Sequence, residues 1–294
     1  MDLDTAPGPA DGSLTEERPG PIGRIRLDRC QGGQRVRRED EVASEEPVEI
    51  RVVPSGQEVA IPIGITMRTP GHDFELAAGF LFSEGVVRQN EDITRIDYCT
   101  EPDEAQRYNV VNVHLGPRVD LDVRRLSRHM FTSSSCGVCG KASLEHLGNL
   151  GARAPTGPTG YSPDLLGSLP ARARKAQPVF ERTGGIHAAA LFDARGELRL
   201  AREDVGRHNA LDKLVGRLLL DEGLPASDTI LLLSGRTSFE LVQKALLAGI
   251  PTVASIGAPS SLAIRVAAGY GMTLVGFLRE NTCNVYSGTD RVRA

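Results

Sequence analysis

Short runs of alternating apolar and polar residues mark the first part of the chain. Such runs cover residues 24–27 and 48–52, and residues 109–115 are rich in valine; both patterns are typical of β-strands. One helix interrupts them, because the turn at residues 69–73 is followed by an apolar face that ends at Gly85. That face consists of Phe74, Ala77, Ala78, Phe80 and Leu81. A small β-rich domain with one helix is therefore predicted.

From Gly184 onward, strands are predicted to alternate with helices. A turn at residues 193–196 lies between two apolar runs and indicates a hairpin, and the following helix has Leu211, Leu214, Val215 and Leu218 on one face. The predicted strands cover residues 188–192, 198–201, 229–233, 252–256, 273–277 and 284–287, and two further helices cover residues 237–248 and 260–270. This order favours right-handed crossovers, so we expect a mainly parallel sheet in a three-layer αβα arrangement.

These patterns divide the chain into four parts. Residues 1–21 are rich in Pro, Gly and acidic residues and are predicted to be disordered. Residues 22–121 form the β-rich domain, and residues 184–294 form the α/β domain that binds a nucleotide or cofactor. Between them, residues 122–183 form a bridging region with a cysteine loop, a short helix at residues 142–147 and a second Pro/Gly-rich stretch. The fold class is α/β, or α+β for the chain as a whole.

Composition narrows the range of functions. The net charge of -4 argues against bulk electrostatic binding to nucleic acid. Five scattered cysteines and an N-terminus without a visible signal peptide indicate free thiols in a reducing cytoplasm. Residues 245–264 carry no charge, but Pro251 and Pro259 interrupt them, so strands and helices explain this stretch better than a membrane span. We expect a cytoplasmic protein with no membrane segment.

Polar residues follow two of the predicted strands in the α/β domain. Ser234, Gly235, Arg236 and Thr237 follow one strand, and residues 257–261 follow the next. In open α/β sheets ligands bind beyond the carboxyl ends of the strands, and helix N-termini attract phosphates. This pattern favours an anionic ligand such as a nucleotide, with ordinary helix capping by Thr237 and Ser260 as the alternative.

Two histidines near these strand ends allow more than one interpretation. The polar run at residues 203–209 opens a predicted helix, where His208 is a candidate acid, base or recognition group. The alternative is a capping turn with Asp204 at the N-cap. We expect His187, which precedes an apolar strand, to be a hydrogen-bonded structural residue.

Cys136 and Cys139 are separated by two residues in a run of small, flexible residues with Lys141 just behind. Such a run has no apolar face to bury, so we expect an exposed loop whose thiol pKa is lowered by the nearby cation. Three chemistries use this spacing: structural zinc binding, dithiol redox exchange and sulfur relay. Zinc needs four ligands and only one pair is evident, so no metal site is predicted. Redox pairs usually open a helix after a strand, whereas a relay requires a nucleophilic thiolate that is accessible to donor and acceptor.

Several motifs together resemble the formate dehydrogenase accessory sulfurtransferases of the FdhD family. The resemblance covers residues 22–290 and is carried by the segments at residues 69–73, 78–85, 136–141, 183–187, 203–213 and 233–236. It implies a sulfur carrier that takes persulfide sulfur from a cysteine desulfurase. The acceptor would be the molybdenum (or tungsten) bis(guanine dinucleotide) cofactor of formate dehydrogenase.

The resemblance also assigns roles and partners. It makes Cys136 the persulfide-bearing cysteine and Cys139 its partner, and it implies a homodimer and a C-terminal domain like the cytidine-deaminase fold. The chain lacks the zinc-ligand motifs of that enzyme, so deamination is an alternative that we do not expect. A GDP-like guanine nucleotide would act as an analogue of the cofactor. Cofactor-binding residues fall on Phe277, Leu278, Arg279, Glu280, Asn281 and Thr282, although the family commonly keeps two basic residues there and this chain has Glu280 and Thr282 after Arg279.

Overall fold

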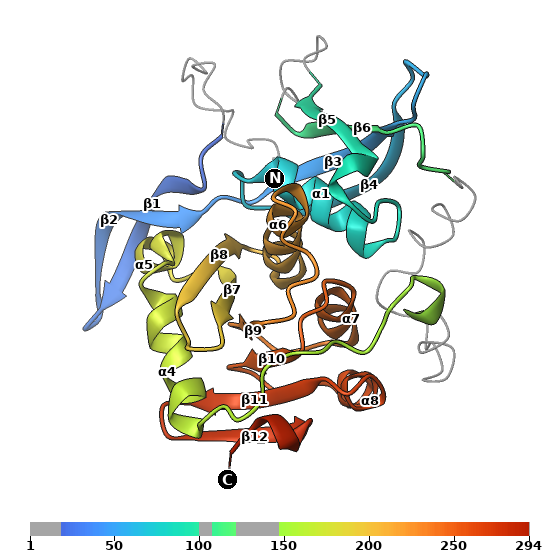
Figure 1. The fold of residues 1–294 in the computed structure, drawn as a ribbon. Coiled ribbons are helices and arrows are strands. Elements are labelled where there is room, and N and C mark those ends of the chain that lie inside the picture. Colours follow the sequence, from blue (N-terminus) through green and yellow to red (C-terminus); the bar gives the residue numbers. More distant parts are fainter. Residues whose placement is uncertain (1–18, 100–107, 122–146, 294) are drawn as a thin grey trace, which may run out of the picture.

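A six-stranded sheet lies in the C-terminal half of the chain, and two of its central strands are fully buried (Figure 1). The structure is a computed structural model that describes residues 19–99, 108–121 and 147–293. The strands lie in the order β12-β11-β10-β9-β7-β8. Their bounds are β7 His187–Asp193, β8 Leu198–Asp204, β9 Thr229–Leu233, β10 Thr252–Ser255, β11 Thr273–Arg279 and β12 Thr282–Ser287. Each of these strands was expected from the sequence, with small differences at the ends.

The sheet is mixed, whereas the sequence predicted a mainly parallel one. The neighbours β9, β10 and β11 are parallel, but β7 is antiparallel to both β8 and β9, and β12 is antiparallel to β11. Strands joined by a tight turn must run antiparallel, and both ends of the sheet are made by such turns. The parallel crossovers are therefore confined to the centre of the sheet.

Helices cover both faces of the sheet, which confirms the three-layer order. One face packs on α6 (Arg207–Leu220), α7 (Phe239–Leu247) and α8 (Ser261–Gly269). The other face packs on α4 (Pro163–Arg174), which is followed by α5 (Pro178–Thr183). This segment was expected to belong to the bridging region at residues 122–183, and neither helix was predicted. Proline at the first position of a helix is well tolerated, and Pro163 and Pro178 both stand there.

A second, four-stranded sheet lies in the N-terminal half and has the order β4-β3-β6-β5. Its strands are β3 Glu46–Val53, β4 Ile61–Arg68, β5 Ile93–Tyr98 and β6 Val110–Leu115. The predicted helix is α1 (Asp73–Ser83), and single 3-10 turns lie at η1 (Asn90–Asp92) and, after β12, at η3 (Thr289–Arg291). Leu76, Ala77 and Leu81 of α1 pack in the same core as the valines of β3 and β6. This half therefore contains a four-stranded sheet and the expected helix, and β4 and β5 are strands that were not predicted.

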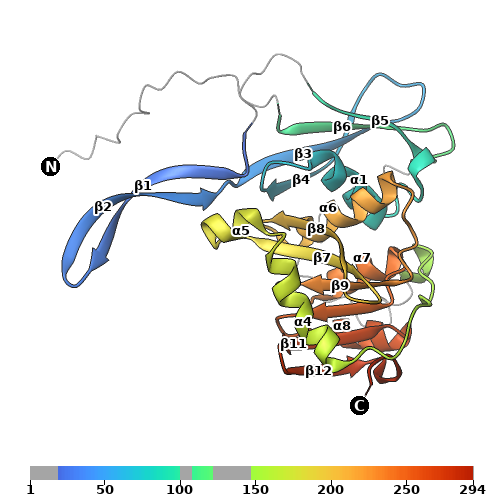
Figure 2. The same cartoon turned by 60° about the vertical axis from the view of Figure 1, so that its left-hand side comes forward.

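A long hairpin extends from this half as an arm (Figure 2). It consists of β1 (Ile22–Gln31) and β2 (Gln34–Ala43), paired in antiparallel register along their whole length. The sequence indicated only the start of β1, because β2 is so rich in charged residues that it lacks a clear apolar alternation. The predicted helix at residues 142–147 falls almost entirely outside the described residues, as does the predicted disordered segment at residues 1–21.

The two halves meet where α1 crosses α6 at very close range. An added Cβ on Gly79 would lie 1.9 Å from the backbone oxygen of Asp212, and one on Gly216 would lie 1.8 Å from the backbone oxygen of Glu75. Only glycine at both positions allows the two backbones to approach this closely. The crossing therefore fixes the N-terminal sheet against the helix layer of the C-terminal half.

Candidate functional site

The ends of three adjacent strands lie side by side at one edge of the C-terminal sheet. The Gly257 backbone N–H donates to the Gly235 oxygen at 3.2 Å, and the Phe277 N–H donates to the Gly257 oxygen at 3.1 Å. The Thr237 N–H donates to the Ala258 oxygen at 3.1 Å. Backbone hydrogen bonds thus join all three segments that the sequence singled out at strand ends.

A cavity of about 660 Å³ lies beside the end of β11 and is covered by α4. Its lining includes the cations Arg172, Lys175 and Arg279 together with Asp164 and Glu280. The guanidinium of Arg279 donates to the Ile256 and Leu278 backbone oxygens at 2.9 and 2.7 Å, which holds it at the cavity wall. Three cations against two carboxylates make this cavity suited to an anion such as a phosphate group.

Close packing of α4 against the β11–β12 turn shapes this cavity. An added Cβ on Gly167 would lie 2.1 Å from the backbone oxygen of Glu280, so the helix and the turn touch through their backbones. The N-terminus of α4 is capped by Ser162, whose hydroxyl accepts from the Leu165 N–H at 3.1 Å. Arg172 and Lys175 are therefore placed on the cavity by a helix that is fixed at two points.

A second cavity, of about 400 Å³, shares Pro170 and Ile256 with the first. His187 and Ser234 line it, with Gly184 and Gly185 beside them. The Ser234 hydroxyl accepts from the Ala188 N–H at 2.9 Å and lies 3.3 Å from His187 Nδ1. Burial, assisted by the charge of Arg207, lowers the pKa of His187. His187 is thus hydrogen-bonded to Ser234 beside the end of the neighbouring strand, which is the kind of contact that a structural histidine makes.

The predicted site residues fall into three groups. Leu278, Arg279, Glu280 and Asn281 line the first cavity, and Ser234 lines the second. Gly235, Arg236, Thr237, Phe277 and Thr282 line neither; Thr237 is buried between the strand ends, whereas Arg236, Phe277 and Thr282 are exposed. Cys136 and Cys139 lie outside the described residues.

Arg172 and Lys175 were missed from the sequence, because the helix that carries them was not predicted.

The helix caps agree only in part with the alternative interpretation of the two loops, in which Thr237 and Ser260 are ordinary N-caps. Ser260 caps α8 by accepting from the Ala263 N–H at 3.2 Å, but α7 begins after Ser238 and not after Thr237. The capping alternative is therefore right for one loop and wrong for the other.

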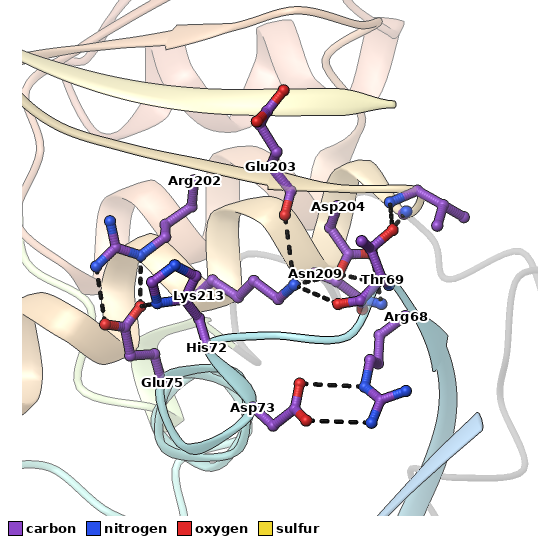
Figure 3. Close-up of polar contacts among 12 residues, drawn as sticks. Arg68, Thr69, His72, Asp73, Glu75, Arg202, Glu203, Asp204, Asn209 and Lys213 are labelled. Atoms are coloured by element: carbon purple, nitrogen blue, oxygen red, sulfur yellow. Dashed lines mark hydrogen bonds and ion pairs between the residues drawn. The ribbon is translucent and has the colours of Figure 1, made fainter. Parts of the chain in front are cut away.

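Asp204 does not cap a helix; it binds the two halves of the chain together (Figure 3). It ends β8 and is fully buried, and Gly206 occupies the N-cap of α6. The Asp204 carboxylate lies 2.7 Å from Lys213 Nζ and accepts from the Thr69 N–H at 3.1 Å. Lys213 in turn donates to the Thr69 oxygen at 2.8 Å. The polar run at residues 203–213 thus holds the turn before α1 in place.

A second charged contact crosses the same boundary. Arg202 donates to both carboxylate oxygens of Glu75, at 2.5 and 2.8 Å, and His72 Nδ1 lies 3.4 Å from that carboxylate (Figure 3). Burial alone would raise the pKa of Glu75, but the hydrogen bonds from Arg202 and His72 outweigh it and lower this pKa to about 2. Glu75 is therefore ionised throughout the physiological pH range, so its negative charge can hold the two halves together through Arg202.

His208 lies at the start of α6 and lines neither cavity. Its Nε2 lies 3.1 Å from the Ser238 hydroxyl and 3.1 Å from the Glu240 carboxylate. Burial, followed by the charges of Arg207 and Lys244, lowers the pKa of His208 to about 4. A base with so low a pKa is poorly matched to proton transfer at neutral pH, so the geometry favours a structural role over acid–base work.

Two kinds of feature are absent from the described part of the chain. No helix in residues 19–99, 108–121 or 147–293 is both long and apolar enough to span a bilayer. Within the same ranges, no three His, Cys, Asp or Glu side chains are grouped as ligands of a metal ion would be. Cys136 and Cys139 lie outside these ranges.

Together these features define a two-part α/β protein whose C-terminal sheet carries a cation-lined cavity at its strand ends. The chain belongs to the FdhD/NarQ family, whose model matches residues 43–293. It is 51% identical over 286 residues to the sulfur carrier protein FdhD of Streptomyces coelicolor, covering 96% of each chain. It is 42% identical to the protein of the same name from Sulfurisphaera tokodaii, covering 92% of this chain and 99% of that one.

A solved structure is similar over almost the whole chain. The crystal structure described as that of a formate dehydrogenase accessory protein from Desulfotalea psychrophila superposes with a TM-score of 0.70 at 26% sequence identity. The match covers 92% of this chain and 99% of that chain. The resemblance seen in the sequence motifs is thus confirmed at the level of the family.

Proposed function

We propose that this protein is a sulfur carrier that formate dehydrogenase requires for its activity. It takes persulfide sulfur from a cysteine desulfurase and delivers it to the molybdenum or tungsten bis(guanine dinucleotide) cofactor, which is its acceptor substrate. The names of the relatives support sulfur carriage, and the similarity to a formate dehydrogenase accessory protein supports service to that enzyme. We also infer the cytidine-deaminase likeness of the C-terminal half, which the three-layer order supports.

The observation that carries the acceptor side of this proposal is the cation-lined cavity. Arg279, which the family resemblance assigns to cofactor binding, lies there with Arg172 and Lys175. These three side chains would hold the phosphate groups of a guanine nucleotide by charge-assisted hydrogen bonds. The adjoining cavity beside His187 and Ser234 offers polar partners for a further part of the same ligand.

Thiolate chemistry accounts for the donor side. The Cys136 thiolate attacks the terminal sulfur of the persulfide on the desulfurase, the S–S bond of that persulfide breaks, and the desulfurase cysteine leaves as a thiolate. Cys136 then carries the persulfide, and no net oxidation has taken place. Attack by the Cys139 thiolate on the inner sulfur forms a Cys136–Cys139 disulfide and releases the outer sulfur as hydrosulfide for the acceptor. A cellular dithiol reductant restores the pair.

A substitution of the proposed carrier cysteine tests this function. We expect Cys136→Ala to abolish formate dehydrogenase activity in a strain that has no other copy of this protein, with the unfolding midpoint of the purified variant unchanged. After incubation with a desulfurase and cysteine, mass spectrometry of the wild-type protein should find one added sulfur atom on the Cys136 peptide. Cys30→Ala is the matched control, because Cys30 is an exposed thiol outside the residues that the family model matches.

Other results would favour the alternatives left open by the sequence. Normal formate dehydrogenase activity in the Cys136→Ala strain would rule out the carrier role. Stoichiometric zinc in the purified protein, together with a Cys136 thiol that resists alkylation, would favour a metal site. A reversible disulfide without any sulfur adduct would favour dithiol redox exchange.

A further inference from the structure

The side chain of Gln177 is buried beside the second cavity. Gln177 precedes α5, is only 7% exposed and lines the cavity of about 400 Å³. Its backbone is fully paired, because its N–H donates to the Arg174 oxygen at 3.3 Å and its oxygen accepts from the Glu181 N–H at 2.9 Å. Its side chain does not cap α5, and among the residues that the structure describes the amide has no hydrogen-bond partner.

A buried amide without a partner points to a ligand. Most buried side-chain polar groups in folded proteins are hydrogen-bonded, and an unpaired one lowers stability. The amide of Gln177 carries N–H donors beside a carbonyl acceptor. It therefore pairs best with a group that presents an acceptor next to a donor, and the cavity that Gln177 lines is the place for such a group.

The other walls of this cavity suit a flat ring. Its volume lies within the roughly 300–1,000 Å³ that is usual for small-molecule sites. Most of its lining is apolar, with contributions from Ala173, Ile186, Leu232 and Ile256. Apolar walls with a few placed polar groups are the usual composition of a site for a heterocyclic ligand.

A stacked pair of side chains stands at the rim of the cavity. The guanidinium carbon of Arg174 lies 3.8 Å from the centre of the Phe180 ring, and both residues line the cavity. Glu203 holds this segment in place, since its carboxylate accepts from the Val179 and Phe180 N–H groups at 3.0 and 2.8 Å. Nucleobases stack on aromatic rings and on guanidinium planes. The cavity thus combines a stacking surface with a buried amide.

We propose that the second cavity binds a fused nitrogen heterocycle and that Gln177 recognises the lactam edge of its ring. The Gln177 amide N–H donates to the ring carbonyl oxygen, and the amide oxygen accepts from the neighbouring ring N–H. Guanine and pterin both carry this edge, because they share an aminopyrimidinone ring. The inference rests on the proposed function, since both rings occur in the acceptor cofactor named there. It adds a recognition site outside residues 277–282, which the family resemblance assigns to that cofactor.

The position of the second cavity agrees with this ligand. The two cavities share Pro170 and Ile256, so a ring in the second lies next to the cations of the first. One nucleotide can therefore occupy both cavities, with its phosphates among the cations and its base beside Gln177. For this reason we expect guanine to be the ring that Gln177 recognises.

A methyl group on the lactam nitrogen tests the contact. In calorimetry, GDP methylated at that nitrogen should bind the wild type at least about tenfold more weakly than GDP, because the methyl group removes the N–H that Gln177 accepts. Gln177→Ala should weaken GDP binding by about tenfold, and the two nucleotides should then bind it within about twofold of each other.

Two control variants separate this contact from general damage. Gln57→Ala removes an exposed glutamine of the N-terminal half and should bind both nucleotides as the wild type does. Phe180→Leu keeps an apolar side chain but loses the flat ring, so it should weaken both nucleotides by a similar factor of about fivefold or more. Only the Gln177 variant should abolish the effect of the methyl group.

The same comparison with pterin, and with pterin methylated at its lactam nitrogen, distinguishes the two sources of the ring. The ring whose methyl effect disappears in Gln177→Ala is the one that the cavity binds. A methyl effect that is equal in the wild type and in Gln177→Ala for both rings, or no binding of either ring, would overturn the proposal. Sulfur transfer to the Cys136 peptide is measured separately, so failure of the ring site would leave the sulfur-carrier function standing. Loss of that sulfur adduct with an intact Gln177 effect would overturn the carrier function and not the ring site.

Discussion

Arg202 and Glu75 show what single polar side chains do in this molecule. Their bidentate pair is almost buried, and it joins β8 of one half to α1 of the other. The Asp204–Lys213 pair, which is fully buried, makes the corresponding joint through the Thr69 backbone. Buried charges are tolerated only when they are paired and hydrogen-bonded, so these residues hold the halves in one relative orientation.

The acid stability of the protein should depend on Glu75. Its folded pKa of about 2 lies below the ordinary value of 4.5, so its contribution is complete above about pH 4.5 and is lost as the pH falls toward 2. We expect Glu75→Gln to lower the free energy of unfolding by about 2 kcal/mol at pH 7, because it leaves Arg202 without its charged partner.

Chemical denaturation at pH 7 and at pH 3 measures this effect, and the difference between variant and wild type should shrink at the lower pH. The control is Glu39→Gln, which removes a pair between exposed side chains on the arm and should cost almost nothing. Equal losses for the two variants would contradict the role assigned to Glu75.

The role of the first cavity's cations in nucleotide binding can be tested with GDP as the probe. Arg279→Ala and Arg172→Ala should each weaken GDP binding by about tenfold in calorimetry, since each removes a charge-assisted contact to phosphate. Arg265→Ala is the matched control, because Arg265 is an exposed arginine on α8, on the opposite face of the sheet. Unchanged affinity in both cavity variants would move the nucleotide site elsewhere.

At the scale of elements, buried apolar runs were predictable and Pro-containing or charged elements were not. The strand β9 has the bounds expected from residues 229–233, because five apolar or β-branched residues in a row have few other uses. The helix α4 was missed, because Pro163, Gly167 and Pro170 made its sequence resemble a linker. Arg172 and Lys175 were therefore missed as well, and only the part of the candidate site at the strand ends was predicted.

The crossing of α1 and α6 was also hidden in the sequence. Glycine inside a helix normally lowers stability by about 1 kcal/mol relative to alanine, so Gly79 and Gly216 look unfavourable in isolation. Only the tertiary structure reveals that a backbone oxygen of the other helix occupies the place of each missing Cβ.

Replacement of Gly216 should therefore reverse the usual effect of alanine in a helix. We expect Gly216→Ala to lower the free energy of unfolding by about 3 kcal/mol, because its Cβ would overlap the Glu75 backbone. Gly23→Ala is the control, since its Cβ would meet only ordinary contacts at 3.8 Å. Urea denaturation of both variants measures the difference, and a neutral Gly216→Ala would mean that the two helices are free to move apart.

The whole molecule places the candidate cavity and the joint between the halves on different parts of the structure. The cavity lies under α4 at the strand ends, while α6 and its neighbours α7 and α8 cover the other face of the sheet. The arm leaves the opposite half and touches the body at α5 through Arg182.

The close helix crossing also limits how the sequence of this protein can vary over evolution. A side chain at position 79 forces the backbone at position 212 to retreat, and this displaces position 216 and the Glu75–Arg202 pair with it. Larger residues can therefore replace Gly79 and Gly216 only together, and only if residues 75 and 202 change as well. Among descendants of this sequence, these four positions should be inherited as a group, while the residues of the arm drift independently.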